Sequence, residues 1–125
     1  AYRFEIENKR IVFSGDTSKS EALINFSSHA DILVHEVLNL EGVDAIIKNT
    51  YPGNEAFRKH IVDGHTSMAE VGQVANEANV ETLVLNHFVP TGSPILDKEE
   101  IWLAGVGEHF KGSIIVGTDL KKISF

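Results

Sequence analysis

The stretch IVFSGDTS, residues 11–18, decides the fold of this 125-residue chain. Three consecutive β-formers without a polar break predict a strand that is buried on both faces, and the polar residues after them predict the turn where it ends. Gly15 lets the backbone bend sharply, so Asp16 lies just beyond the end of this strand. The carboxyl edge of a sheet is where α/β proteins build their sites, and Asp16 is therefore the first candidate site residue.

The same arrangement recurs three times further along the chain, each time as three apolar β-formers followed by polar residues. The repeats are residues 32–34 before His35 and Glu36, residues 83–85 before Asn86 and His87, and residues 114–116 before Asp119. Because the carboxyl ends of parallel strands meet at one edge of a sheet, we expect these polar residues to gather there.

The rest of the chain predicts an opening hairpin and several helices. Tyr2, Phe4 and Ile6 alternate with polar residues, which indicates a half-buried strand, and a short turn leads from it into the strand at Ile11. Residues 122–125 suggest a closing strand. The helices are expected over residues 18–28 with a Ser18–Glu21 capping box, twice within residues 43–61 with Asn54 as the second cap, after a Ser67–Glu70 capping box, and from Asp97 to about Phe110.

This order of elements predicts an α/β fold with short, right-handed parallel crossovers and with helices on one face of the sheet. Trp102 and the other apolar helical positions are expected in the core. Strands this apolar need cover on both faces, and the sequence offers helices for only one. We therefore expect that a further layer lies outside this chain.

The composition of the chain excludes several classes of functional site. The chain contains no cysteine, so any metal site must use histidine and carboxylate. Its net charge is −7, and no run of lysine and arginine exceeds two residues, which argues against a broad electrostatic grip on nucleic acid. No apolar run approaches the ~20 residues needed to span a bilayer, so we expect a cytoplasmic protein without membrane contact.

Four motifs follow one another in a fixed order: SGDT at residues 14–17, VHE at 34–36, GHTS at 64–67 and LNHFVP at 85–90. With these motifs the chain resembles the metallo-β-lactamase superfamily, and within it the branch of ribonuclease Z and the related arylsulfatase-like and phosphodiesterase hydrolases. That family's fold is an αββα sandwich of two similar halves. The resemblance implies that residues 1–125 form the C-terminal half, a mixed sheet with helices on one face. The N-terminal half, with its His-X-His-X-Asp-His motif, is absent from this sequence.

The resemblance also implies roles for four residues. Asp16 matches the aspartate that bridges two metal ions, and His87 matches a terminal ligand of the second metal, with Asn86 where threonine is common. Glu36 and His65 match the pair that handles the proton, although the residues around them differ from the His-Glu-Ala-Thr and His-Ser-Thr motifs of ribonuclease Z. The cofactors implied are two divalent metal ions, with zinc favoured and manganese or iron as alternatives.

Elementary chemistry supports these roles and also offers simpler ones. A carboxylate has two oxygens with which to hold two cations, imidazole suits zinc, manganese or iron, and a histidine beside a carboxylate can donate a proton near neutral pH. Without the family, however, Asp16 is a turn or cap residue and His87 a strand-end histidine. Likewise, His65 is a residue that caps a helix and Glu36 a buried acceptor for a backbone amide.

Among the residues near these motifs, His35 points to the opposite face from Glu36 and is interpreted as structural, bonding across the sheet. Thr17 and Ser67 are interpreted as caps and Asp119 as a turn residue. Two hypotheses follow for the function. In the first, the intact parent is a metal-dependent hydrolase of RNA or small-molecule esters that uses a metal-activated water. In the second, the chain is a non-catalytic fragment that associates through its exposed sheet face, for example as a homodimer.

Overall fold

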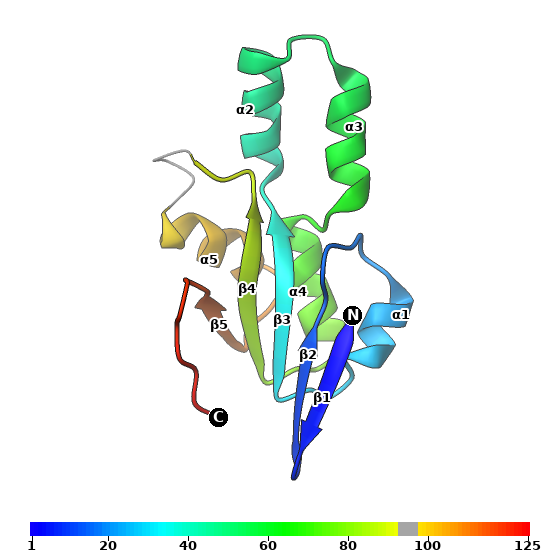
Figure 1. The fold of residues 1–125 in the computed structure, drawn as a ribbon, viewed down its shortest axis with the longest axis vertical. Coiled ribbons are helices and arrows are strands. Elements are labelled where there is room, and N and C mark those ends of the chain that lie inside the picture. Colours follow the sequence, from blue (N-terminus) through cyan, green and yellow to red (C-terminus); the bar gives the residue numbers. More distant parts are fainter. Residues whose placement is uncertain (93–97) are drawn as a thin grey trace.

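The computed structural model describes residues 1–92 and 98–125, and a five-stranded sheet in the order β1-β2-β3-β4-β5 lies at its centre (Figure 1). The opening hairpin pairs β1 with β2 in antiparallel fashion, and every later neighbour is parallel, as predicted. The strands are β1 Tyr2–Ile6, β2 Lys9–Phe13, β3 Ile32–Leu38, β4 Thr82–Val89 and β5 Ser113–Val116. The carboxyl ends of β2, β3, β4 and β5 therefore meet at one edge of the sheet.

Five helices are seen in the described part of the chain: α1 Glu21–Phe26, α2 Leu40–Thr50, α3 Glu55–Gly64, α4 Met68–Glu77 and α5 Glu99–Gly107. Helices α1, α4 and α5 cover one face of the sheet, whereas α2 and α3 form a helical hairpin beyond the carboxyl end of β3 (Figure 1). The predicted mixed α/β fold with helices on one face is thus confirmed. None of these helices is long and apolar enough to cross a membrane.

The main core lies between the sheet and its three helices. Leu33, Leu83 and Leu85 are fully buried on the strand side, and the stripe of α4 that begins at Val71 is buried opposite them. Each such side chain contributes roughly 1.5–3 kcal/mol when it leaves water. Trp102 is 3% exposed and packs against the core, which confirms its predicted place.

Two of the predicted helix caps, Ser67 and Asn54, are confirmed, and the predicted cap of α1 is wrong. Ser67 and Glu70 form a complete capping box at α4, and Asn54 caps α3. Helix α1 starts later than predicted, because Ser20 rather than Ser18 accepts the hydrogen bond from the amide of Leu23. The predicted cap of the last helix, Asp97, lies outside the described residues.

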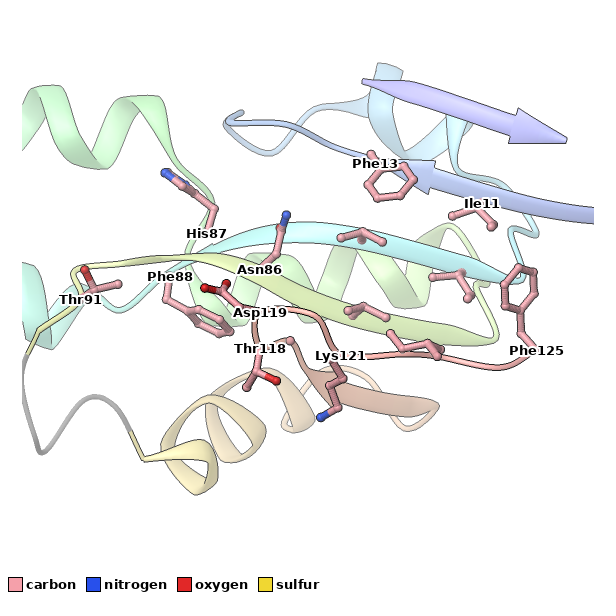
Figure 2. A pocket seen from close by; sticks show the side chains of 15 residues that line it. Ile11, Phe13, Asn86, His87, Phe88, Thr91, Thr118, Asp119, Lys121 and Phe125 are labelled. Carbon is pink, nitrogen blue, oxygen red and sulfur yellow. The ribbon is translucent and has the colours of Figure 1, made fainter.

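The face opposite the helices is open. Tyr2, Phe4 and Ile6 are 74%, 53% and 62% exposed, so the predicted half-burial of β1 is wrong for the described chain. A groove of about 690 Å³ runs along the face, floored by strand residues such as Val34 and walled by the C-terminal segment that ends at Phe125 (Figure 2). Residues 122–125 are not a strand, contrary to expectation. Instead, the apolar residues of this segment line the groove.

Candidate metal centre

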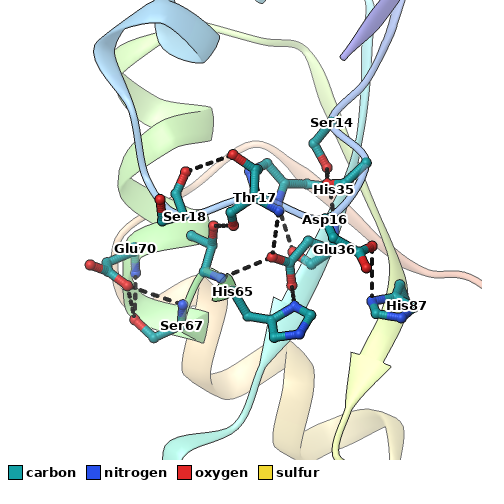
Figure 3. Close-up of polar contacts among 12 residues, drawn as sticks. Ser14, Asp16, Thr17, Ser18, His35, Glu36, His65, Ser67, Glu70 and His87 are labelled. Atoms are coloured by element: carbon teal, nitrogen blue, oxygen red, sulfur yellow. Dashed lines mark hydrogen bonds and ion pairs between the residues drawn. The ribbon is translucent and has the colours of Figure 1, made fainter. Parts of the chain in front are cut away.

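Three residues that are far apart in the sequence meet at the carboxyl edge of the sheet. Asp16, His65 and His87 each offer a ligand atom, and these atoms all lie within 4.8 Å of one another. Asp16 comes from the loop after β2, His65 from the junction of α3 and α4, and His87 from β4 (Figure 3). The parallel strands therefore place Asp16 and His87 together, and the junction of α3 and α4 brings His65 to the same edge.

Asp16 is positioned by a turn that continues the pairing of β2. The amide of Ser14 donates to the carbonyl of Val34 at 2.9 Å, and Gly15 then adopts a positive φ of 64°, a conformation that glycine enters without steric cost. An Oδ1 atom of Asp16 lies 3.3 Å from Nδ1 of His87, and their side chains are 61% and 49% exposed. Both groups are thus open to a cation or a substrate from outside.

His87 occupies a β-bulge. Glu36 pairs with Asn86 and Val37 pairs with Phe88, so His87 is the extra residue of β4, and its φ is 41°. A bulge re-aims a side chain that a regular strand would place on the other face. This irregularity brings the imidazole to the Asp16 side of the edge, and no pattern in the sequence predicts it.

Glu36 lies behind these residues and is completely buried. Its Oε1 accepts hydrogen bonds from the backbone amides of Thr66 at 2.9 Å and Thr17 at 3.2 Å, and its Oε2 lies 3.3 Å from Nδ1 of His65 (Figure 3). Burial raises the pKa of Glu36, and the two amides and His65 partly offset this rise. Glu36 is therefore an acceptor for backbone amides and also lies next to His65.

Thr17 and Thr66 tie the loop of Asp16 to the loop of His65, a connection that sequence reasoning missed. The hydroxyl of Thr66 donates to the backbone carbonyl of Thr17 at 2.5 Å, and Thr66 is fully buried. The prediction that Thr17 caps a helix is wrong, because Ser20 caps α1 and the Thr17 hydroxyl donates to the carbonyl of Ser18. The only signal in the sequence was the position of Thr66 directly after the candidate histidine.

His65 lies between Glu36 and the exposed edge. Its side chain is 19% exposed, and its ring stacks on that of His87 with centroids 5.6 Å apart and an interplanar angle of 29°. Apart from facing each other, the buried atoms Nδ1 of His65 and Oε2 of Glu36 make no hydrogen bond to the described residues. His65 can therefore act on a substrate or complete a three-ligand site with Asp16 and His87.

The donor set fits a first-row divalent cation. One carboxylate and two imidazoles supply the oxygen and nitrogen ligands that zinc, manganese and iron accept, and three protein ligands are usual for catalytic zinc. The exposure of Asp16 and His87 leaves room for further ligands on the open side. Geometry and ligand chemistry thus allow these three residues to hold a metal ion at this edge.

Comparison with known proteins points the same way, although no protein-family model matches the chain. The chain is 35% identical over 122 residues to ribonuclease Z of Mycobacterium tuberculosis (strain ATCC 25618 / H37Rv), covering 98% of the chain and 41% of the relative. It is 34% identical to ribonuclease Z of Mycobacterium marinum, covering 98% of the chain and 40% of that relative. The chain spans half or less of the length of the curated relatives that it matches.

A solved structure shows the same fold. The metallo-β-lactamase fold protein YhfI from Bacillus subtilis superposes with a TM-score of 0.64 at 22% identity, over 92% of this chain and 40% of that one. The matched region includes a mixed sheet with helices on one face, the arrangement that carries Asp16 and His87 at its edge. The chain therefore has the metallo-β-lactamase fold and is similar over nearly its whole length to part of ribonuclease Z.

Proposed function

We propose that this chain supplies one side of the active site of a metal-dependent hydrolase that cleaves phosphodiester or other ester bonds. The observation that carries the proposal is the meeting of Asp16, His65 and His87 within 4.8 Å, with Glu36 buried behind them. The relatives named ribonuclease Z support the same reaction class. The remaining part of such an enzyme lies outside these 125 residues, and we expect the enzyme in the cytoplasm.

Asp16 and His87 are the residues that would hold metal. The two oxygens of Asp16 can serve two divalent cations, zinc by preference and manganese or iron as alternatives, and His87 can serve one of them. When bound, a pair of such cations supplies an ionised water as the nucleophile and neutralises charge on the ester oxygens. The other ligands come from the part of the protein that this chain does not contain.

His65 and Glu36 are the proton-handling pair. The carboxylate of Glu36 is fixed by two backbone amides, so it holds the ring of His65 in one orientation. A histidine held in this way can deliver a proton to the oxygen of the leaving group, a contribution of about 10²–10⁴-fold to the rate. Because Glu36 fixes the orientation of the His65 ring, the pair is suited to general acid catalysis.

The substrate class is an RNA or a small-molecule ester. Two relatives are ribonucleases by name, which favours RNA. The chain itself has a net charge of −7 and offers no run of basic residues, so an RNA would have to be gripped elsewhere in the protein. A small ester needs no such grip and remains the alternative substrate.

The full-length protein tests this proposal. We would measure bound metal by mass spectrometry and hydrolysis of both a small nitrophenyl phosphodiester and an RNA. Asp16→Ala and His87→Ala should lose metal and activity together, and His65→Ala should keep metal while its kcat falls by about 10²-fold or more. His60→Ala, which removes an exposed imidazole on α3, is the matched control. Activity of the His65 variant within about threefold of wild type would refute the proton role.

The open sheet face favours a second function. Tyr2, Phe4 and Ile6 are exposed beside an apolar groove, and contiguous apolar surface of this kind is typical of interaction sites. In this alternative the chain by itself is a non-catalytic module that associates through this face, with a second copy as the simplest partner. Its oligomeric state tests the alternative independently of any activity.

A further inference from the structure

We propose that His35 is a positioning residue. Its ring holds the backbone carbonyl of Glu36 at the point where β3 and β4 change register, and it thereby aims Glu36 and His87 at the candidate metal centre. His35 is fully buried, and the hydrogen bond of its ring goes to the backbone of Glu36 rather than to a candidate metal ligand. Its influence passes through the backbone.

The contact itself is short and local. Nδ1 of His35 lies 2.6 Å from the backbone oxygen of Glu36, and the histidine is fully buried. A carbonyl oxygen can only accept, so Nδ1 must carry the proton. Burial lowers the pKa of His35, which keeps the ring neutral with a single N–H. The expectation that His35 bonds across the sheet is wrong, because its partner is the next residue of its own strand.

The contact between His35 and Glu36 lies where the pairing of β3 with β4 changes register. The register between β3 and β4 shifts between Glu36 and Val37, and the residue left over on β4 is His87, with a φ of 41°. A bulge disrupts the regular ladder of backbone bonds locally. The His35 ring supplies a donor to a carbonyl at this site, so it fixes the peptide plane that follows Glu36. The orientation of this peptide plane determines where along β3 the neighbouring strand β4 forms its bulge.

Packing alone does not explain a histidine here. His35 shares the helix-covered face with Leu33 and Val37, which are apolar and fully buried. Its Nε2 is buried and has no hydrogen-bond partner among the described residues, which costs stability. An aliphatic residue would avoid this cost. What it could not do is donate a hydrogen bond to the carbonyl of Glu36.

Three variants of the full-length protein separate positioning from packing. Leucine fills the space without a donor, asparagine places an N–H close to the position of Nδ1, and glutamine carries the same amide beyond it. We expect His35→Leu and His35→Gln to lower metal affinity and kcat by about 10–100-fold, and His35→Asn to stay within about fivefold of wild type. The Tm of His35→Leu should equal or exceed that of wild type.

Several results would overturn the inference. These are His35→Leu retaining metal affinity and kcat, His35→Asn losing as much as His35→Gln, or activity that falls only in proportion to the folded fraction. A purely structural histidine predicts that last pattern, together with a lower Tm for His35→Leu. The contrast between asparagine and glutamine stays informative even if the leucine variant folds poorly.

The measurements of metal affinity and kcat rest on the proposed function, whereas a comparison of crystal structures does not. Crystal structures of wild type and His35→Leu should show residue 87 leaving the positive-φ region and Glu36 shifting away from the amide of Thr66. If wild type neither binds metal nor cleaves esters, the proposed function fails, yet this comparison still tests His35. If wild type is active and residue 87 is unmoved in the leucine variant, the inference about His35 fails alone.

Discussion

The burial of Glu36 favours its neutral form, whereas its proposed catalytic role requires its charged form. Glu36 is completely buried, yet its proposed role requires a negative charge beside His65. The two amides that bind its Oε1 come from loops rather than from the sheet ladder, so the carboxylate also organises the backbone around it. Stability and activity should therefore respond in opposite directions when its charge is removed.

Glu36→Gln tests this opposition. The folded pKa of Glu36 is raised above its ordinary value of 4.5, so its contribution to stability is fully present below pH 4.5 and is lost as the pH rises through the folded value. Glutamine keeps an oxygen for both amides but cannot ionise. We expect the variant to be at least as stable as wild type at neutral pH, with a flatter dependence of stability on pH, in urea unfolding of the metal-free protein.

The same substitution should lower kcat of the full-length enzyme by about tenfold or more, because His65 loses its anionic partner. Glu70→Gln is a suitable control, since it removes a carboxylate charge in the α4 capping box without touching His65. A Glu36→Gln protein that is less stable than wild type at neutral pH would contradict this account of the buried charge.

Thr66 is expected to matter through its hydroxyl alone. Thr66→Val keeps the shape of the side chain but leaves the carbonyl of Thr17 without its buried donor, which should cost about 1–3 kcal/mol of unfolding free energy. Thr66→Ser keeps the hydroxyl and should recover most of that loss. We expect the kcat of the full-length enzyme to fall more for Thr66→Val than for Thr66→Ser. Equal losses for valine and serine would indicate a role for the methyl group in packing instead.

At the level of elements, the capping box of α4 connects helix stability to the site. Ser67→Ala removes the bond to the amide of Glu70 and should cost about 1 kcal/mol. Since Ser67 follows the His65 loop by two residues, we also expect kcat to fall. Asn54→Ala removes the equivalent cap of α3, away from the site, and should reduce stability alone. Thermal unfolding and kinetics of both variants distinguish the two effects.

Packing between α4 and α5 depends on a glycine. A Cβ at Gly72 would meet the backbone oxygen of Val106 at 2.5 Å, whereas a Cβ at Gly107 would lie 3.8 Å from Ile114. Gly72→Ala should therefore force the helices apart and destabilise by about 1–3 kcal/mol. Gly107→Ala should be neutral or slightly stabilising, because alanine favours helix over glycine. Denaturant unfolding of both proteins checks this, and equal effects would exclude close helix contact as the cause.

The elements that the sequence predicts correctly are those fixed by local chemistry. Strand β3 follows from an apolar run, and the caps at Asn54 and Ser67 follow from side chains that bond nearby amides. The start of α1 was predicted two residues too early, because the sequence offers two serines before the apolar stripe and only Ser20 accepts a bond from a helix amide. The C-terminal segment likewise follows the open face rather than its own β-propensity.

The candidate site also contains some features that the sequence predicts and others that it does not. Four ordered motifs identified Asp16, Glu36, His65 and His87, and strand topology predicted that they would gather at one edge. The bulge that re-aims His87 could not be predicted, since it depends on register between two strands that are distant in sequence. The same holds for the bond from Thr66 to Thr17, which exists only once the two loops are side by side.

At the scale of the whole molecule, the sheet has one face covered by helices and one face without cover among the described residues. The open side combines the exposed β1 residues with the apolar groove that the C-terminal segment lines, and Figure 2 shows this groove. Hydrophobic surface of this extent is costly in water, and the C-terminal segment shields only part of it. The 125-residue chain on its own should therefore hide this face by association.

We expect the isolated chain to dimerise or form larger species in light scattering, and to bind a hydrophobic dye. Replacing Tyr2, Phe4 and Ile6 together by threonine keeps β-propensity but removes apolar surface, so it should shift the chain toward monomer and reduce dye binding. Replacing Arg3 and Glu5 by threonine alters the other face of the same strand and should leave association unchanged. If the isolated chain is a monomer without dye binding, then residues 1–125 tolerate this face in water. That result would contradict the proposal that the chain associates through its open sheet face.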